Sequence, residues 1–233
     1  MQTPVITAFD WVPDFARGQV RDLRVRWALE EIGRPYTVRY LSQGQQKQPD
    51  HRARQPYGQV PTYEDGAVTL YESGAIVLHL AEGTALLPTD PAARAQALEW
   101  SFSALNTVEP PIMDQAIATL FEADKPWSAP RLPAIEARIR GRLAETAARL
   151  DDREWYRDTF SAGDLLMVAV LRILRDDPLL AEQPTLAAYV ARGEARPAFQ
   201  RALADQLAGF TGAPPPEFAA WLEQQKQREG ETA

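Results

Sequence analysis

YGQVPTYEDGAVTLYESGAI, residues 57–76, is the stretch that decides the fold. Two short segments in it, residues 62–64 and 68–71, have the composition of β-strands. Asp65-Gly66 lies between them, and an Asp-Gly pair favours a two-residue hairpin turn because glycine adopts the required positive φ angle without a steric penalty. The stretch therefore predicts a β-hairpin.

The residues after the hairpin change to the pattern of a short helix. Ile76 and Leu80 are apolar positions of this helix, and Gly83 is placed to end it. Ser73 is placed to cap the first turn, which leaves backbone N–H groups free for an anion. Glu72 beside it offers a carboxylate to an ammonium group. A carboxylate next to a helix N-terminus suits the head group of a free amino acid.

Val60-Pro61, at the entrance of the first hairpin strand, is a second binding element. A proline there removes one donor from the strand ladder and tends to leave the backbone of its neighbour unpaired. If the peptide bond is cis, Val60 offers both its N–H and its C=O to a peptide-like ligand. An ordinary hairpin followed by a capped helix remains the alternative interpretation of these residues alone.

The overall composition indicates a globular protein without a membrane span. The chain has 233 residues, of which 45% are hydrophobic and 24% charged, enough for one large or two modest domains. Its net charge of −7 argues against nucleic acid as a partner, because phosphate binding needs a positive surface. No apolar run approaches the ~18 residues of a membrane span, and the N-terminus has no basic segment followed by an apolar one. We therefore expect a cytoplasmic protein with neither a nucleic-acid nor a membrane partner.

Cysteine and histidine usage excludes several kinds of chemistry. The chain has no cysteine, which excludes disulfides and a protein thiol nucleophile. Its two histidines, His51 and His79, are too few for a Cys/His metal cluster, so we expect no metal site. We expect His79, in the middle of a short apolar helix, to be a packed structural histidine.

The order of elements before the linker is that of a thioredoxin-like domain. Residues 5–9 predict a first strand, residues 21–32 a helix and residues 36–41 a second strand. The hairpin and the short helix follow. A strand, helix and strand followed by a hairpin and a helix form the thioredoxin-like plan.

The rest of the chain is predicted to be helical. Residues 84–91, TALLPTDP, contain two prolines and no period, and therefore predict a linker. Ser161 and Asp164 form a capping box ahead of residues 165–171, which have no polar side chain and should be buried on nearly every side. The other predicted helices are at residues 92–121 with a kink at Pro110-Pro111, 134–150, 185–195, 198–207 and 216–228.

The motifs GQVP, EDG and ESGAI resemble the glutathione-binding half of the cytosolic glutathione transferase superfamily, to which bacterial proteins also belong. RVRWALEEIGRPYTV resembles the first helix and second strand of these proteins, and LLPTDPAARAQALEW their interdomain connection. The resemblance covers nearly the whole chain up to about Phe210. It implies a thioredoxin-like α/β domain at residues 1–83, a linker at 84–91 and an all-helical domain at 92–233.

The resemblance also implies a glutathione site. Val60, with Pro61, would pair with the cysteinyl backbone of glutathione. Glu72 and Ser73 would hold its γ-glutamyl end.

Two more residues are implied at the glycyl end of glutathione. Lys47, nine residues before Pro56, has the spacing of a lysine that meets the glycyl carboxylate in several classes. Gln59 occupies a position where the family often places Lys or Gln near the same carboxylate. For Lys47, a solvated lysine on a mobile loop is an equal alternative.

The group that would activate the glutathione thiol departs from the family pattern. The family uses a Tyr, Ser or Cys between the first strand and first helix, and this chain has none of them there. The donor position falls on Trp11 when counted from the strand and on Gln19 when counted back from the helix. Arg17 could stabilise a thiolate by its charge, so Arg17 and Gln19 rank above Trp11. Trp11 and Phe15 have the alternative role of walls of the site.

A pocket for a second substrate is implied beside the thiol. Its residues would come from the loop around Phe15 and from the first helix of the helical domain: Asn106, Thr107, Pro110 and Met113. The resemblance therefore implies a cytoplasmic, homodimeric detoxification enzyme that uses glutathione as co-substrate and joins it to a small hydrophobic electrophile. Lyase, isomerase and peroxidase chemistry use the same thiolate. A non-catalytic glutathione-binding or protein-interaction module on this fold is the alternative function.

Overall fold

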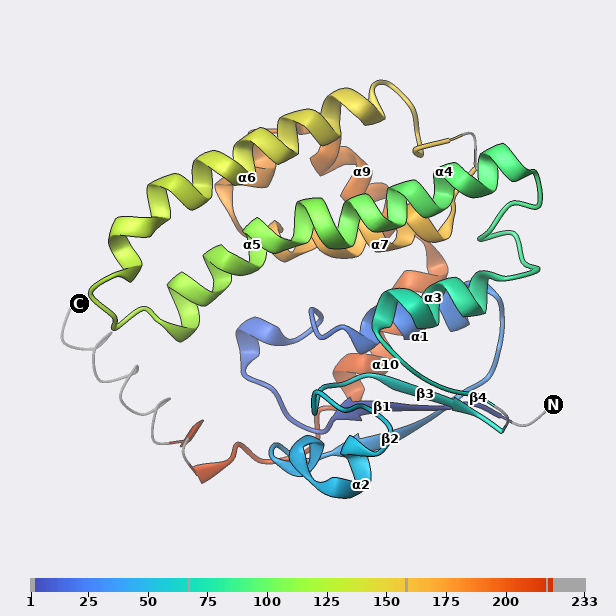
Figure 1. The fold of residues 1–233 in the computed structure, drawn as a ribbon, viewed down its shortest axis with the longest axis vertical. Helices are drawn as coiled ribbons and strands as arrows, with labels where there is room; N and C mark the ends of the chain where they lie inside the picture. Colours follow the sequence, from blue (N-terminus) through green and yellow to red (C-terminus); the bar gives the residue numbers. More distant parts are fainter. Residues whose placement is uncertain (1–2, 67, 158, 217, 220–233) are drawn as a thin grey trace. The chain divides into compact units, whose positions relative to one another are not determined.

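Four short strands form one mixed β-sheet (Figure 1). The structure, a computed structural model, describes residues 3–66, 68–157, 159–216 and 218–219. The strands are β1 Val5–Phe9, β2 Thr37–Leu41, β3 Thr62–Asp65 and β4 Val68–Tyr71. Their order is β2-β1-β3-β4, with β1 and β2 parallel and the other neighbours antiparallel. This order and polarity are those of the predicted thioredoxin-like plan, and all four predicted strands are present.

The hairpin turn lies one residue later than predicted. Asp65 still pairs with Val68, so Asp65 belongs to β3 and the turn begins at Gly66. Gly66 has a φ of 51°, in the left-handed region that the Asp-Gly signal predicted.

A helix occurs at every predicted helical segment within the described residues, with two differences. The helix predicted at residues 134–150 begins at Ser128 and contains Pro133, and a short helix at Pro178–Ala181 was not predicted. The α-helices are α1 Asp22–Glu31, α2 Pro49–Arg52, α3 Ser73–Ala81, α4 Pro91–Phe102, α5 Glu109–Ala116, α6 Ser128–Leu150, α7 Ala162–Leu171, α8 Pro178–Ala181, α9 Pro184–Glu194 and α10 Pro197–Ala208. Short 3₁₀ turns occur at Asp14–Ala16, Gln45–Lys47 and Arg172–Leu174. The helix predicted at residues 216–228 lies almost entirely outside the described residues. Among the helices described, none is long and apolar enough to cross a membrane.

The chain divides into two compact units. Unit 1 comprises the residues up to Leu23, Pro35–Ser73 and the residues from Leu203 onward, and it contains the whole sheet and α2. Unit 2 comprises Arg24–Arg34 and Gly74–Ala202, and it is helical. Each unit draws on separate segments of the chain, and the domain boundaries at residues 83 and 92 remain a prediction.

The core of unit 2 is built around α7 (Figure 1). All its residues except Ala169 are buried, as predicted. Gly163 and Gly193 make this possible, because an added Cβ would lie 2.7 Å from the Ala97 carbonyl oxygen at the first and 2.6 Å from Val168 at the second. Helix α7 therefore packs directly on α4 and α9.

The long helix predicted at residues 92–121 is interrupted by two π-helical segments. They are Ser103–Val108, between α4 and α5, and Ile117–Phe121. The first directly precedes the prolines that were predicted to kink the helix. Because Pro110 and Pro111 have no N–H, the carbonyl of Asn106 has neither an α-type nor a π-type partner within the helix. The kink is therefore taken up as a widened turn before the prolines.

Candidate functional site

The sheet topology brings the predicted unit 1 residues to one end of the sheet. Strands β1 and β2 are parallel, and β3 is antiparallel to β1, so β3 begins where β1 and β2 end. Thr62 pairs with Tyr71, so β4 ends where β3 begins. We call this end the loop end of the sheet. The ten candidates there are Trp11, Phe15, Arg17 and Gln19 after β1, Lys47 after β2, Gln59, Val60 and Pro61 before β3, and Glu72 and Ser73 after β4.

Val60 has an unpaired backbone at the loop end. The Val60-Pro61 peptide bond is cis. Neither the N–H nor the C=O of Val60 has a hydrogen-bond partner within the described part of the chain. An unpaired donor and acceptor on one residue can bind the backbone of a peptide as one more strand would.

Glu72 is held in a left-handed backbone conformation directly before α3. Its φ is 70°, which is uncommon for a residue with a side chain and costs about 1–3 kcal/mol. The Glu72 side chain is exposed, and its carboxylate has no hydrogen-bond or ion-pair partner among the residues described. This carboxylate is available to an ammonium group.

Ser73 is the first residue of α3 and is 5% exposed. Ser73 was predicted to be the cap that precedes the helix. In the structure the helix already begins at Ser73, and the left-handed Glu72 precedes it. A residue at a helix N-terminus lies beside backbone N–H groups that favour an anion. Glu72 and Ser73 therefore present an acceptor for a cation next to donors for an anion.

Lys47 lies against the turn that leads to Gln59. Its Nζ donates a hydrogen bond to the Tyr57 carbonyl oxygen at 3.3 Å. A Cβ added to Gly58, which has a φ of 63°, would lie 2.8 Å from Lys47 Cδ. Glycine at residue 58 therefore lets the lysine side chain lie across the turn, with its ammonium group at the Tyr57 carbonyl.

The loop between β1 and α1 contains the candidate thiol donors. Arg17 is half-buried; its Nε lies 3.2 Å from Asp14 Oδ1, and its guanidinium lies 5.7 Å from the ring centre of Phe210. Gln19 is half-buried, and its backbone N–H donates to the Ala16 carbonyl at 3.0 Å. Both residues stay candidates.

The indole N–H of Trp11 is a hydrogen-bond donor that the loop does not use. It is 6% exposed, and its carbonyl accepts a hydrogen bond from Gln43 at 3.0 Å. Its indole Nε1–H has no hydrogen-bond partner among the residues that the structure describes. This open donor favours Trp11 more than its position in the sequence alone does.

The segment after α10 packs on the same loop. The Gly212 N–H donates to the Asp10 carbonyl at 2.8 Å, and a Cβ added to Gly212 would lie 2.6 Å from Asp10 Cγ. The rings of Trp11 and Phe218 lie 5.4 Å apart in an edge-to-face arrangement. Residues near the other end of the sequence thus contact the candidate donor loop.

The residues predicted for the electrophile pocket fall in different units. Phe15 belongs to unit 1, and the other four belong to unit 2. Asn106 and Thr107 lie in the π-helical segment, Pro110 is exposed at the start of α5, and Met113 is half-buried. The pocket itself remains a prediction.

The prediction for His79 is wrong, and His51 takes the structural role instead. His79 is exposed, because α3 buries Ile76, Val77 and Leu80 and turns residue 79 to the opposite face. His51 is 4% exposed, and its Nε2 lies 2.6 Å from the Gln59 carbonyl oxygen. Sequence patterns did not assign His51 or Gln55 a role. Their position as polar residues shortly before the GQVP motif was the feature that could have indicated one. No group of residues that could hold a metal ion occurs in the described ranges.

Residues 23–86 match the family model of the glutathione S-transferase N-terminal domain. A search of curated proteins found no match. Among solved structures, poplar glutathione transferase F1 is similar at a TM-score of 0.77 and 21% identity, over 88% of this chain and 99% of that chain.

Two bacterial structures are similar at a TM-score of 0.76. A glutathione transferase from Pseudomonas putida with one glutathione disulfide bound per subunit has 22% identity, over 86% of this chain and 90% of that chain. A glutathione transferase from Burkholderia graminis with two glutathione molecules bound per subunit has 24% identity, over 86% of this chain and 87% of that chain. The predicted fold class, a thioredoxin-like α/β domain followed by a helical region, is confirmed.

Proposed function

We propose that this chain is a member of the glutathione transferase superfamily, that it binds glutathione at the loop end of its sheet, and that it activates the thiol for attack on a small hydrophobic electrophile. In this proposal residues 1–83 form the glutathione-binding domain, residues 84–91 the linker and residues 92–233 the helical domain. The protein would act as a cytoplasmic, homodimeric detoxification enzyme with glutathione as co-substrate.

One observation carries the proposal. Val60, before β3, and Glu72, after β4, lie at the same end of the sheet, and the Val60 backbone and the Glu72 carboxylate have no partner within the described part of the chain. The Val60 backbone would pair with the cysteinyl unit, and the Glu72 carboxylate would accept the γ-glutamyl ammonium group. Ser73 would hold the γ-glutamyl carboxylate, and Lys47 with Gln59 would meet the glycyl carboxylate. A carboxylate, an unpaired peptide and a lysine at the same end of the sheet match the charged and peptide groups of glutathione.

The chemistry requires a thiolate. The thiol proton would pass to solvent, and the sulfur lone pair would form a bond to the electrophilic carbon while the leaving group departs with its electron pair. A hydrogen-bond donor from Arg17, Gln19 or Trp11 would favour the thiolate by lowering the pKa of the bound thiol. Phe15, Asn106, Thr107, Pro110 and Met113 would contact the electrophile.

Calorimetric titration with glutathione, followed by an ultraviolet scan for thiolate across pH, tests this function. We expect binding and a thiolate band below the pH range of the free thiol. Of the variants Arg17→Ala, Gln19→Ala and Trp11→Phe, the one that removes the donor should lower turnover about a hundredfold. Arg94→Ala, which removes a surface ion pair with Glu82 in unit 2, is the control and should leave turnover unchanged.

The outcomes separate the proposal from the alternative function. Binding without the low-pH thiolate band would favour a non-catalytic glutathione-binding module. Absence of binding would contradict the proposal and leave only the fold. The activity panel should include glutathione disulfide, because the similar protein from Pseudomonas putida has this compound bound.

A further inference from the structure

The backbone on the N-terminal side of Val60 is held by two buried side chains. His51 Nε2 lies 2.6 Å from the carbonyl oxygen of Gln59, and because a carbonyl can only accept, Nε2 donates this hydrogen bond. The backbone N–H of Gln59 donates to Gln55 Oε1 at 3.2 Å. His51 is 4% exposed and Gln55 is 2% exposed. Both backbone groups of Gln59 are therefore paired out of solvent, whereas those of Val60 are open.

The backbone on the other side of the cis bond is held as well. The N–H of Thr62 donates to Thr7 Oγ1 at 2.7 Å, and the two threonine hydroxyls lie 3.0 Å apart. Thr7 and Thr62 are fully buried. Val60 and Pro61 thus lie between two anchored residues.

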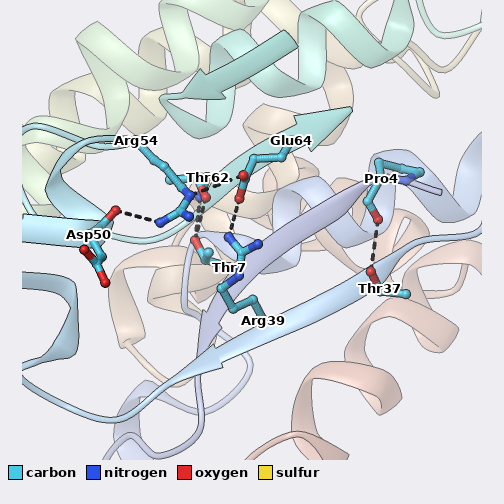
Figure 2. Close-up of polar contacts among 8 residues, drawn as sticks. All are labelled: Pro4, Thr7, Thr37, Arg39, Asp50, Arg54, Thr62 and Glu64. Atoms are coloured by element: carbon cyan, nitrogen blue, oxygen red, sulfur yellow. Dashed lines mark hydrogen bonds and ion pairs between the residues drawn. The ribbon is translucent and has the colours of Figure 1, made fainter. Parts of the chain in front are cut away.

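The segment that carries His51 and Gln55 is itself tied to the sheet. Figure 2 shows Glu64 of β3 between Arg39 of β2 and Arg54, which follows α2. Arg54 Nε lies 3.2 Å from Glu64 Oε2, and its Nη1 donates to the Asp50 carbonyl at 2.6 Å. Arg54, the residue directly before Gln55, therefore connects the first turn of α2 to β3. Anchors that are themselves fixed hold a binding group in place before a ligand arrives.

We infer that His51 and Gln55 are positioning residues, which fix the backbone of Gln59 so that the N–H and C=O of Val60 are oriented toward the backbone of a bound peptide. This inference rests on the proposed function for the identity of that peptide, glutathione. Neither side chain contacts the ligand; each acts through the backbone of Gln59. The chain uses buried polar side chains here because a loop backbone has no strand neighbour to pair with.

The first experiment compares the dissociation constant for glutathione in His51→Ala with that in His79→Ala, the exposed histidine of α3. We expect His51→Ala to weaken binding about fivefold to tenfold, the effect of one buried hydrogen bond, with less than about a twofold change in kcat at saturating glutathione. His79→Ala should stay within about twofold of wild type. A folded His51→Ala protein with the affinity of wild type would overturn the inference.

A modified ligand separates positioning from general loss of structure. A glutathione analogue methylated on its cysteinyl amide cannot donate to the Val60 carbonyl. Methylation should weaken binding to wild type about tenfold and weaken binding to His51→Ala clearly less, because the receiving carbonyl is no longer oriented. Equal losses in both proteins would show that His51 does not act through Val60.

Amide hydrogen exchange of the free protein tests the anchoring without any ligand. The Gln59 amide should be protected and the Val60 amide should exchange freely, and Gln55→Met should remove the protection at Gln59. An unprotected Gln59 amide in wild type would overturn the inference whether or not glutathione binds. The expected exchange pattern in a protein that binds no glutathione would overturn the proposed function and support the anchoring alone.

Discussion

At the scale of single residues, Glu72 combines backbone strain with a carboxylate that is unpaired among the described residues. A residue with a side chain is disfavoured at a φ of 70°, and Glu72 lies beside the cis Val60-Pro61 segment at the loop end of the sheet. Strain of this kind persists where the surrounding structure imposes it, and it concentrates at functional sites. Here the strained residue is the one proposed to accept the γ-glutamyl ammonium group.

We therefore expect Glu72→Gly and Glu72→Gln to differ in stability but not in binding. Glycine relieves the strained φ and should raise the free energy of unfolding by up to about 1 kcal/mol, whereas glutamine keeps the strain and should leave it unchanged. Both variants should weaken glutathione binding at least about tenfold, because both remove the charge. Urea unfolding and calorimetric titration measure the two effects. A less stable Glu72→Gly variant would contradict the role given to strain.

At the scale of secondary structure, the N-terminus of α7 is held by a dense set of buried hydrogen bonds. Asp164 accepts hydrogen bonds from the backbone of Tyr156 and Ser161 and from the hydroxyls of Ser161 and Tyr189, at 2.7–2.9 Å. Burial raises the pKa of Asp164, although these hydrogen bonds lower it in part. Burial and the charge of Asp164 raise the pKa of Tyr189.

The raised pKa of Asp164 sets the sign of its pH dependence. The folded state holds the proton more firmly than the unfolded chain, whose pKa is near the ordinary value of 3.8. The contribution of this titration to stability is therefore fully present below pH of about 3.8 and is lost as the pH rises through the folded pKa.

Asp164→Asn removes this titration and leaves several buried donors poorly paired. We expect its free energy of unfolding to be about 2–4 kcal/mol below that of wild type at neutral pH, with a larger deficit near pH 4. Urea unfolding at both pH values measures the deficit, and Asp152→Asn, an exposed change, is the control. A deficit that shrinks in acid would show that the hydrogen bonds outweigh burial and that the pKa is lowered.

Sequence patterns predicted the helices and strands well wherever the side-chain period was regular. The four strands and the buried α7 are short-range features, set by alternation, turn residues and a capping box. The π-helical turn at Ser103–Val108 was not predicted, because its apolar spacing does not differ from that of an α-helix. His79 was misplaced because an apolar segment of nine residues does not show which face is buried.

The sequence indicated the residues proposed to bind the ligand, but it did not indicate the contacts that hold those residues in place. Val60, Glu72 and Ser73 follow from local motifs. The hydrogen bonds of His51 and Gln55 to Gln59 lie within a short helix and the irregular backbone after it. The ion pairs of Glu64 with Arg39 and Arg54 join segments that are distant in the sequence. No periodicity within one segment reports such contacts.

At the scale of the whole molecule, exposed aromatic side chains favour the proposed self-association. Large aromatic side chains that are at least half exposed include Tyr57, Phe102, Phe121 and Trp127. Exposed apolar side chains that form one contiguous patch are typical of surfaces that bind another protein, and we expect some of these four to do so in the proposed dimer. Tyr57 also stacks edge to face on Tyr71, with ring centres 6.1 Å apart.

Size-exclusion chromatography with light scattering should therefore give twice the 26.0 kDa mass of one chain. The dimer mass should persist at moderate salt, since apolar contacts are not screened. Tyr57→Ser should shift the population toward monomer on dilution, and Tyr40→Ser, at an exposed tyrosine of β2, is the matched control. A mass of 26.0 kDa at every concentration would rule out the homodimer.

The contacts of the segment after α10 with the β1–α1 loop bear on how this protein can be engineered. Gly212 touches Asp10, and Phe218 packs on Trp11. A library that randomises only residues 10–21 to change substrate preference would test most new side chains against a fixed and unsuited neighbour. A shortened protein that stops after Ala208 would likewise alter the donor loop while leaving the sequence of that loop intact. Gly212 and Phe218 should therefore be retained in any shortened form and varied together with the loop that they contact.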